Sequence, residues 1–465
     1  MTQHLVWFRN DLRVADNPAL YQACRESTRV RAVYIDCPGQ WREHGQGSRQ
    51  LDFIDRNLSR LQHALQQRGI ELNRLQCDDF SQVPDLLAAH IQQQGISKLF
   101  ANREIPVNER RRDRAVKDRL EIPFELFNGD CVISHGSLRT GNGQMYRVYT
   151  PFSKAWLAAL REQGYRLYAP PDIIDPTAPA NMNSDPHSPW PAGEDAAHQR
   201  LQAFCAEQLN DYQAQRDYPA LDATSALSPY LAIGVLSPGQ CLSAIEQALG
   251  YLPMSRGETG FSWLNELIWR EFYRHLLVVY PGLSMHQPFK TDMKSLTWVD
   301  DEALFKAWCD GLTGYPIIDA AMRCLNQTSW MHNRLRMVVA SFLTKDLQID
   351  WRRGEAYFMA QLIDADLAAN NGGWQWAAGT GADAAPYFRI FNPTTQGQRF
   401  DPEGIFVRRW LPELANVPDK HIHMPHSWLQ QQGIADLYPA PVVDHALARQ
   451  QTLARYQALK TQEKL

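Results

Sequence analysis

The sequence predicts a two-part chain, in which an α/β domain built on a parallel sheet precedes a larger all-α domain. Three observations lead to this fold class: short apolar runs alternate with helical patterns over residues 1–130, prolines cluster at 169–195, and helical patterns dominate 196–465. Such alternation is typical of a doubly wound, Rossmann-like sheet with helices on both faces. We therefore expect domains at 1–130 and 196–465, joined by a connector at 131–195.

Four apolar runs in the first domain are expected to be buried strands: HLVWF at 4–8, VRAVYID at 30–36, KLFAN at 98–102 and FELFN at 124–128. A helix ending at Gly69 is expected between the second and third, because five apolar residues share one helical face: Leu51, Ile54, Leu58, Leu61 and Leu65. The sequence contains no GxGxxG or GxxxxGK[ST] loop. GNGQMY at 141–146 is expected to be a turn.

The composition is that of a globular protein, with 44% hydrophobic and 21% charged residues among 465. The net charge of −4 means that any polyanionic partner must meet a local basic patch. Eight scattered cysteines without a CxxC pair predict reduced thiols. The chain shows neither a signal peptide nor an apolar run long enough to span a membrane. We therefore expect a cytoplasmic protein.

The segment NNGGWQWAAGTGADAAPYFRIFNP at 370–393 mixes helix-breaking residues with large aromatic ones. Gly-Gly and Asn-Gly predict a sharp bend or a close approach of the backbone to another group. Aromatic rings beside such a bend require a partner surface, which we expect to be a flat ligand.

Hydroxyl side chains precede PYLAIG, which is a predicted helix start. Thr224, Ser225 and Ser228 supply them together with consecutive backbone N–H groups. A helix N-terminus of this kind suits an anion or a phosphate. Simple N-capping of the helix explains the same residues.

Two helical segments interleave aromatic and basic residues, WLNELIWREFYRH at 263–275 and WMHNRLRM at 330–337. In the first, Glu266–Arg270 and Arg270–Arg274 are i,i+4 neighbours. Such segments suit unstacked bases and phosphates, and they also suit an aromatic core with salt bridges. Together with 370–393 they favour a flat ring ligand.

Two segments have a superficial likeness to metal sites. Asp364, Asp366 and Asn370 resemble the start of a calcium loop, but Ala369 replaces its glycine and the closing Glu is missing. HIHMPH at 421–426 has no acidic or Cys ligand nearby and is expected to be a polar loop. We expect no metal.

Five motifs in order resemble the photolyase/cryptochrome family, and most closely its class I bacterial branch, which acts on cyclobutane pyrimidine dimers (CPDs). They are WFRNDLRVADNPAL, WLNELIWREFYRHL, GYPIIDAAMR, WMHNRLRM and DLAANNGGWQWAAGTGADAAPYFRIFNP. The resemblance implies an α/β antenna domain and a helical FAD domain. It implies a monomeric lyase that uses light and reduced, anionic FAD to split dimers flipped out of UV-damaged DNA.

The resemblance also assigns residues to FAD. Those that match FAD-holding positions are Tyr212, Thr224, Ser225, Ala226, Leu227, Ser228, Trp263, Glu266, Arg270, Trp330, Asn333, Arg336, Asp364, Ala365, Asp366 and Asn370. The segment Thr224–Ser228 matches the phosphate-binding part. Asn370 matches the residue beside the flavin N5.

Further matches concern the dimer and DNA. The expected catalytic residues are Glu266, Trp269, Asn333, Met337 and Asn370. Glu266 would hydrogen-bond the dimer, Trp269 would stack on it, and Asn333 and Met337 would line its pocket. The expected DNA contacts are Arg216, Glu266, Trp269, Arg270, Tyr273, Asn333, Arg334 and Trp376.

Two further sets match electron donors and an antenna. Trp298, Trp351 and Trp374 match a donor chain to the flavin, although core packing explains buried Trp equally. Asn108 and Glu109 match positions that bind 5,10-methenyltetrahydrofolate, although Glu109 could be a solvated charge at a helix start. Ser284 and Met285 depart from the Cys and Lys of close bacterial relatives; a deazaflavin is the alternative antenna.

Three other functions were compared with CPD repair. A blue-light cryptochrome shares the fold but usually carries a C-terminal extension. A (6-4) photolyase is expected to have His at positions 333 and 337, where this chain has Asn and Met. A flavoprotein oxidoreductase would need a nicotinamide site, which we do not find.

Overall fold

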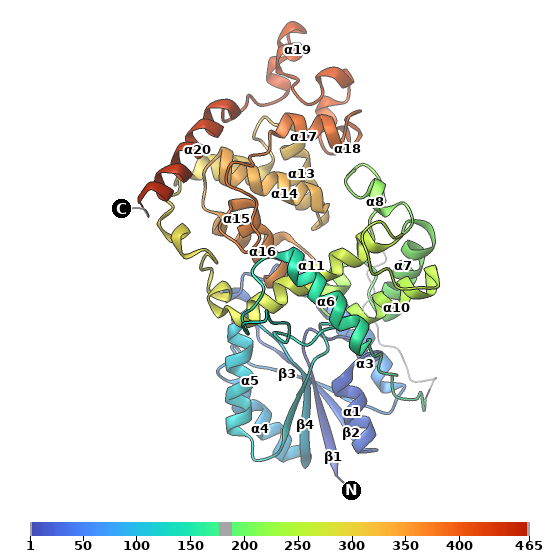
Figure 1. Cartoon of the computed structure of the whole chain (residues 1–465). Helices are drawn as coiled ribbons and strands as arrows, with labels where there is room; N and C mark the ends of the chain where they lie inside the picture. Colours follow the sequence, from blue (N-terminus) through green and yellow to red (C-terminus); the bar gives the residue numbers. More distant parts are fainter. Residues whose placement is uncertain (1, 176–187, 463–465) are drawn as a thin grey trace. The chain divides into compact units, whose positions relative to one another are not determined.

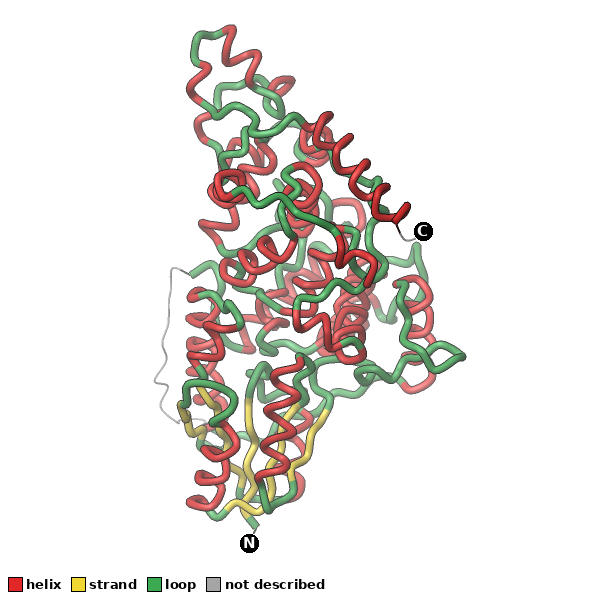
Figure 2. The backbone as a smooth tube through the Cα atoms, turned by 90° about the vertical axis from the view of Figure 1, so that its left-hand side faces the viewer, coloured by secondary structure: helices red, strands yellow, loops and turns green. Residues whose placement is uncertain are grey.

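The computed structural model describes residues 2–175 and 188–462, which divide into two compact units. Unit 1 comprises 1–210, 225–284 and 363–366, and unit 2 comprises 211–224, 285–362 and 367–465. Figure 1 labels the elements, and Figure 2 shows the strands in yellow and the helices in red. We describe each unit by itself, and the domain boundaries expected from the sequence stay a prediction.

Unit 1 contains a five-stranded parallel sheet in the order β3-β2-β1-β4-β5. The strands are β1 (Gln3–Phe8), β2 (Val30–Asp36), β3 (Leu72–Gln76), β4 (Ile96–Asn102) and β5 (Phe124–Phe127). The connecting helices are α1 (Pro18–Glu26), α2 (Pro38–Glu43), α3 (Ser48–Gln66), α4 (Val83–Gln94) and α5 (Val107–Arg119). The expected α/β fold and its four predicted strands are confirmed.

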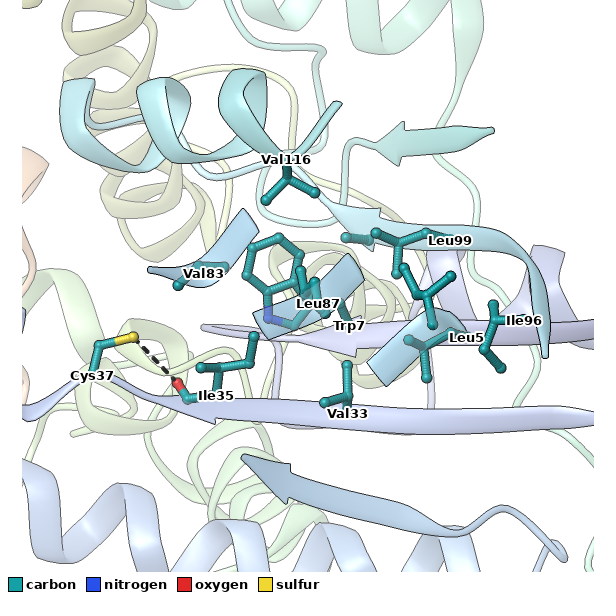
Figure 3. Packing of buried hydrophobic residues seen from close by; sticks show 12 residues of the cluster. Leu5, Trp7, Val33, Ile35, Cys37, Val83, Leu87, Ile96, Leu99 and Val116 are labelled. Atoms are coloured by element: carbon teal, nitrogen blue, oxygen red, sulfur yellow. Dashed lines mark hydrogen bonds between the residues drawn. The ribbon is translucent and has the colours of Figure 1, made fainter. Parts of the chain in front are cut away.

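The sheet buries a hydrophobic cluster beneath α4 and α5 (Figure 3). Alternate residues of β1 face it, Leu5 and Trp7, because successive side chains of a strand point to opposite faces. Leu87 of α4 and Val116 of α5 close the cluster from the helical side. This packing fixes the α/β part of the unit through burial of apolar surface.

β3 and α4 are among the elements of the α/β part that were not predicted from the sequence. β3 pairs only with β2 at the edge of the sheet, and its LNRLQ sequence is half-buried or exposed throughout. An edge strand needs no continuous apolar run, so its pattern is weak. Because the pattern of β3 is weak, the helix that follows it was not expected either.

The rest of unit 1 is helical. Its helices are α6 (Tyr149–Gln163), α7 (Glu194–Glu207), α9 (Ser228–Ala232), α10 (Pro238–Leu249) and α11 (Phe261–Val279). α6 packs against α11, and α7 packs against α10. The parts of the Pro-rich connector at 169–175 and 188–193 contain no helix or strand, whereas its residues 176–187 lie outside the described part of the chain.

Unit 2 is a helical assembly. Its helices are α8 (Tyr212–Gln215), α12 (Glu302–Asp310), α13 (Pro316–Thr328), α14 (Asn333–Ser341), α15 (Trp351–Gln361), α16 (Leu367–Ala378), α17 (Pro393–Phe400), α18 (Ile405–Trp410), α19 (His426–Gln431) and α20 (His445–Gln462). A π-helical turn, Phe342–Asp346, follows α14. Short 3₁₀ segments of unit 2 occur at 291–295, 412–414, 419–421 and 435–437. Another 3₁₀ segment, 281–285, lies in unit 1 except for its last residue.

The bend expected at Gly372 and Gly373 is wrong, since α16 runs through both glycines. Glycine within a helix costs about 1 kcal/mol relative to alanine, which tertiary packing outweighs here. α16 packs against both α14 and α15. The irregular backbone begins only at Gly379, whose φ is 80°.

Among residues 2–175 and 188–462, no helix is both long and apolar enough to cross a membrane.

Candidate functional site

Helix α11 presents the aromatic residues expected to contact the dimer. The ring of Trp269 stacks on Tyr149 of α6, with 3.5 Å between ring centroids and 4° between planes. The Tyr149 hydroxyl donates to the Asn265 side chain at 2.7 Å, and the Tyr273 ring lies 5.8 Å from Trp269. Trp269 is therefore held from one face by Tyr149, a neighbour that the sequence did not predict.

Two arginines of α11 share one carboxylate, Asp130, which follows β5. Arg270 donates to the Asp130 main-chain oxygen at 2.7 Å and also pairs with its carboxylate, to which Arg274 donates from Nε at 2.6 Å. Burial alone would raise the pKa of Asp130, but the two guanidinium groups outweigh it and hold that pKa below its usual range. Asp130 thus separates two like charges that the i,i+4 spacing brings together.

Arg274 also reaches the segment 363–366. Its Nη1 and Nη2 donate to the two oxygens of Asp366 at 3.0 and 2.8 Å, a bidentate pair. Gln50 donates to the Ala365 main-chain oxygen at 2.7 Å, and Asp364 is buried. The three predicted FAD residues of this segment are therefore fixed within unit 1.

The predicted phosphate segment has an unusual backbone. Ala226 has a φ of 45°, a left-handed conformation that is strained for a residue other than glycine, and Leu227 is right-handed at φ −90° and ψ −4°. A change of hand between successive residues turns their N–H groups toward one point and forms an anion-binding concavity. Ser225 Oγ accepts from Trp263 Nε1 at 3.3 Å. Helix α9 begins at Ser228, as expected.

Helix α14 in unit 2 carries a second predicted set. Asn333 is exposed, Met337 is half-buried, and Arg336 donates from Nε to the Met331 main-chain oxygen at 2.7 Å. His332 caps the helix by accepting from the Arg334 backbone N–H at 3.1 Å. The start of this helix is therefore capped, and its predicted dimer-contacting residues are at least partly exposed.

Two predicted DNA-contacting arginines of unit 2 lie against aromatic rings. Arg334 lies 4.4 Å above the Phe400 ring and pairs with Asp217 at 2.7 Å. Arg216 lies 5.3 Å from the Tyr212 ring. In unit 1, by contrast, the guanidinium of Arg270 is mostly buried against Asp130.

Helices α15 and α16 hold two of the predicted electron-transfer tryptophans. The Trp374 ring occupies the space over Gly354, where a Cβ would come within 2.1 Å of it. Trp351 is buried one turn before Gly354. Trp374 also lies 6.0 Å from Trp308, a fully buried ring that sequence reasoning missed.

Three further tryptophans of unit 2 were predicted to be site residues, Trp298, Trp330 and Trp376. Trp298 is half-buried against a cluster that includes Tyr456, and Arg455 lies 6.0 Å from its ring. Trp376 lies 6.5 Å from Phe391. Trp330 is half-buried ahead of α14, and its main-chain oxygen accepts from Thr328 at 3.0 Å.

The predicted antenna residues converge on a histidine. Asn108 Nδ2 lies 3.0 Å from His44 Nε2, and Glu109 lies 3.7 Å from His44 Nδ1. Glu109 is only 9% exposed, so its interpretation as a solvated charge is wrong, and its Oε2 lacks a hydrogen-bond partner. Burial and the nearby Glu104 raise the pKa of Glu109 to about 7. An unsatisfied buried carboxylate oxygen is a suitable acceptor for a ligand N–H.

Groups of residues that could approach a metal occur around Cys131 in the described part of the chain. They are Asp130–Cys131–His135 and Cys131–Glu271–His275. Asp130 is already paired with arginines, and Glu271 accepts from Trp156 Nε1 at 2.6 Å. Two guanidinium groups beside the cluster disfavour a cation. Two of the three histidines of HIHMPH bind main-chain oxygens, His423 that of Asp401 and His426 that of Pro439.

The stability of unit 1 is predicted to depend on the protonation of Glu109. Because its pKa of about 7 lies above the ordinary value of 4.5, its ionisation is easier in the unfolded chain. The wild-type free energy of unfolding should fall from this source as the pH rises from about 4.5 to 7. Glu109→Gln should remove this loss, a gain of at most about 3 kcal/mol at pH 8.

Urea unfolding of both proteins between pH 4.5 and 8 measures this difference. Glu121→Gln, which replaces an exposed carboxylate near the end of the same helix, is the control and should follow the wild type. A Glu109→Gln curve parallel to the wild-type curve would contradict the buried, hard-to-ionise carboxylate.

Both the N-terminal and the C-terminal part of the chain match models of known protein families. The family description "DNA photolyase" matches residues 4–172, and "FAD binding domain of DNA photolyase" matches residues 263–458. The chain is 50% identical over 472 residues to the Escherichia coli protein named deoxyribodipyrimidine photo-lyase, with 99% of each chain covered. The Vibrio cholerae protein of that name is 45% identical, with 98% of this chain and 99% of the relative covered.

Solved structures give the same result. A class III photolyase from Agrobacterium tumefaciens matches with a TM-score of 0.86 and 37% identity, over 99% of this chain and 98% of that chain. A cryptochrome from Synechocystis matches with a TM-score of 0.85 and 30% identity, over 98% and 99%.

Proposed function

This chain belongs to the DNA photolyase family, and we propose that it is a lyase that repairs cyclobutane pyrimidine dimers in DNA with light. The observation that carries this proposal is identity of up to 50% over essentially the full length to enzymes named deoxyribodipyrimidine photo-lyase. Asn333 and Met337 occupy the positions where a (6-4) photolyase is expected to have His, which further supports dimers as the substrate.

FAD is the cofactor, and the residues of this chain suit it. We assign its phosphates to Thr224–Ser228, where the change of backbone hand at Ala226 and Leu227 provides converging N–H groups. FAD, when bound in its reduced anionic form, supplies the light-driven electron to the dimer and takes it back. We assign its contacts to the remaining matched residues: Tyr212, Trp263, Glu266, Arg270, Trp330, Asn333, Arg336, Asp364, Ala365, Asp366 and Asn370.

The residues of the chain position the dimer. We propose that Trp269 stacks on the flipped pyrimidines with the ring face that Tyr149 leaves uncovered, and that Glu266 hydrogen-bonds their carbonyl and N–H groups. Asn333 and Met337 of α14 are the further residues that we assign to the dimer. Because Tyr149 fixes the Trp269 plane, little side-chain freedom is lost when the dimer stacks there.

The DNA backbone is assigned to a local basic patch, because the net charge of −4 gives no general attraction. Arg216 and Arg334, on their aromatic supports, are the proposed phosphate contacts, with Tyr273 and Trp376 as further DNA contacts. Arg270 was predicted to join this patch, but its guanidinium is mostly buried against Asp130, so we assign it no contact with the DNA backbone. We further propose that the chain acts as a cytoplasmic monomer without a protein partner.

Dimer repair is predicted to require light. Purified protein with reduced FAD should convert thymine dimers in an irradiated oligonucleotide to thymines under near-UV or blue light. Chromatography of the oligonucleotide before and after illumination measures the conversion. Equal conversion in darkness, or none in light with FAD bound, would refute the proposal.

Binding of damaged DNA is predicted to depend steeply on salt through Arg334. Arg334→Ala should weaken binding and reduce the slope of log K against log[salt] by about 1, because one phosphate contact is lost. Fluorescence anisotropy from 50 to 200 mM salt, a range over which multi-contact proteins lose much affinity, measures the slope. The control is Arg114→Ala, an exposed charge on α5. Equal slopes for the two variants would remove Arg334 from the patch.

The chain Trp374–Trp351–Trp298 is proposed to reduce oxidised flavin in light. The contact of Trp374 with Gly354, one turn from Trp351, supports this path. Trp374→Phe keeps the shape of the ring but is much harder to oxidise, so photoreduction should be lost while pre-reduced enzyme still repairs. Flavin absorption during illumination measures this.

Trp308→Phe is the matched control for the path, since Trp308 also contacts Trp374 but is not part of the proposed chain. It should keep photoreduction. Loss in Trp308→Phe together with retention in Trp374→Phe would place the path elsewhere.

We propose 5,10-methenyltetrahydrofolate as the antenna. The unsatisfied Glu109 Oε2 and the Asn108 amide support a ligand that offers amino and ring N–H groups. Reconstitution with this folate should add a near-UV band and transfer excitation to FAD, and Glu109→Ala should remove both. Tight binding of a deazaflavin without folate binding would overturn the choice of antenna and leave the repair proposal intact.

A further inference from the structure

A fully buried carboxylate in unit 2, Glu355 of α15, joins three segments of the chain. Its Oε2 accepts from His286 Nδ1 at 2.9 Å, and its Oε1 accepts from Asn371 Nδ2 at 2.8 Å. Its main-chain oxygen accepts from Asn370 Nδ2 at 2.9 Å. One residue thus contacts both asparagines at the start of α16 and a histidine from the segment before α12.

The hydrogen bonds continue along α16 and return to the histidine segment. Asn371 Oδ1 accepts from Gln375 Nε2 at 2.9 Å, and Gln375 Oε1 accepts from the Phe289 N–H at 2.9 Å. Asn371 and Gln375 are buried, whereas the His286 side chain is 57% exposed. The network therefore runs from solvent at His286 to the interior face of α16.

His286 is held in an unfavourable backbone conformation. Its φ of 55° lies in the left-handed region, which is unfavourable for a residue other than glycine and persists only where surrounding contacts enforce it. Those contacts are the bond to Glu355 and a bond from Arg352 Nε to the His286 main-chain oxygen at 2.8 Å. The backbone is thus strained where the solvent-exposed imidazole of His286 reaches the buried carboxylate of Glu355.

The charges around His286 favour its protonated form. The hydrogen bond to Glu355 raises the pKa of His286. Partial burial and the charge of Arg352 lower this pKa, but by less. Arg352 is itself paired with Asp350 at 3.1 Å. His286 therefore stays charged to a higher pH than an ordinary histidine and supplies Glu355 with a charged donor.

The bond from Asn370 to Glu355 fixes the orientation of the Asn370 carboxamide. A main-chain oxygen only accepts, so the NH2 end must face it, and Oδ1 is directed to the other side. An oxygen acceptor suits a ring nitrogen that carries a hydrogen and repels one that presents a lone pair. The orientation of this amide therefore favours a ring nitrogen that carries a hydrogen over one that does not.

We propose that Glu355 and His286 are positioning residues that hold Asn370 with its Oδ1 presented to the flavin N5, and so favour the flavin forms that carry a proton there. The proposal rests on the assignment of Asn370 to the flavin. Loss of the His286 proton removes the charged donor from a carboxylate that has no access to water. The local packing of α15 on α16 then relaxes, and the Asn370 orientation is less strongly held.

The sign of the pH dependence follows from the raised pKa of His286. The support for N5-protonated flavin is fully present below the ordinary histidine pKa of about 6.5 and is lost as the pH rises through the higher folded-state value. A proton at the protein surface thereby controls the environment of a ring that it does not contact.

The test uses His286→Gln, which keeps a neutral polar side chain at an exposed position, and Glu355→Gln, which keeps the shape of the buried group. Flavin absorption of the FAD-loaded proteins, followed during reduction from pH 6 to 9, reports the fraction that carries the N5 proton. In the wild type this fraction should fall by several-fold across the His286 titration, and in His286→Gln it should be low and nearly independent of pH. The control, His421→Gln, should follow the wild type.

A second measurement needs no flavin. Imidazole NMR of the FAD-free protein should show a lower His286 pKa in Glu355→Gln than in the wild type. Identical flavin profiles for wild type and His286→Gln, or an unchanged His286 pKa in Glu355→Gln, would overturn the inference. Dimer repair by the wild type is measured separately. Absence of repair would refute the proposed function, whereas the NMR result would still test the interaction between His286 and Glu355.

Discussion

The arrangement of unit 1 depends on one carboxylate placed between two arginines. Asp130 follows β5, the last strand in chain order, and binds Arg270 and Arg274, which lie on successive turns of α11. Without it, two buried guanidinium groups would face each other, and removal of one partner from such a cluster typically costs about 3–5 kcal/mol. Because Arg274 also holds Asp366, the sheet, α11 and the segment 363–366 are joined by a single set of ion pairs.

Much of the fold follows from local patterns, and the exceptions have physical causes. The four predicted strands are apolar runs, and strands are present at all four positions, although β5 is half-buried and not buried. β3 was missed because an edge strand is half solvated and carries polar residues. The helix through Gly372 and Gly373 was missed because packing on α14 and α15 outweighs the low helix propensity of glycine.

The candidate site likewise combines residues that the sequence predicted with residues that it did not. Residues such as Trp269, Asn333 and Asn370 belong to contiguous motifs that identify them directly. Their supports, Tyr149 and Glu355, are distant in sequence, and no periodicity or spacing signals them. The motifs predict which side chains should meet ligands, and they do not predict which neighbours fix the orientation of those side chains.

The account holds that a flavin held by these residues uses light to split pyrimidine dimers. The action spectrum of dimer splitting by the purified protein, compared with the absorption spectrum of its bound chromophores, tests this most directly. We predict that the two spectra coincide through the near-UV and blue, with no splitting in darkness. Splitting that does not follow the absorption of the bound flavin and antenna would contradict the account.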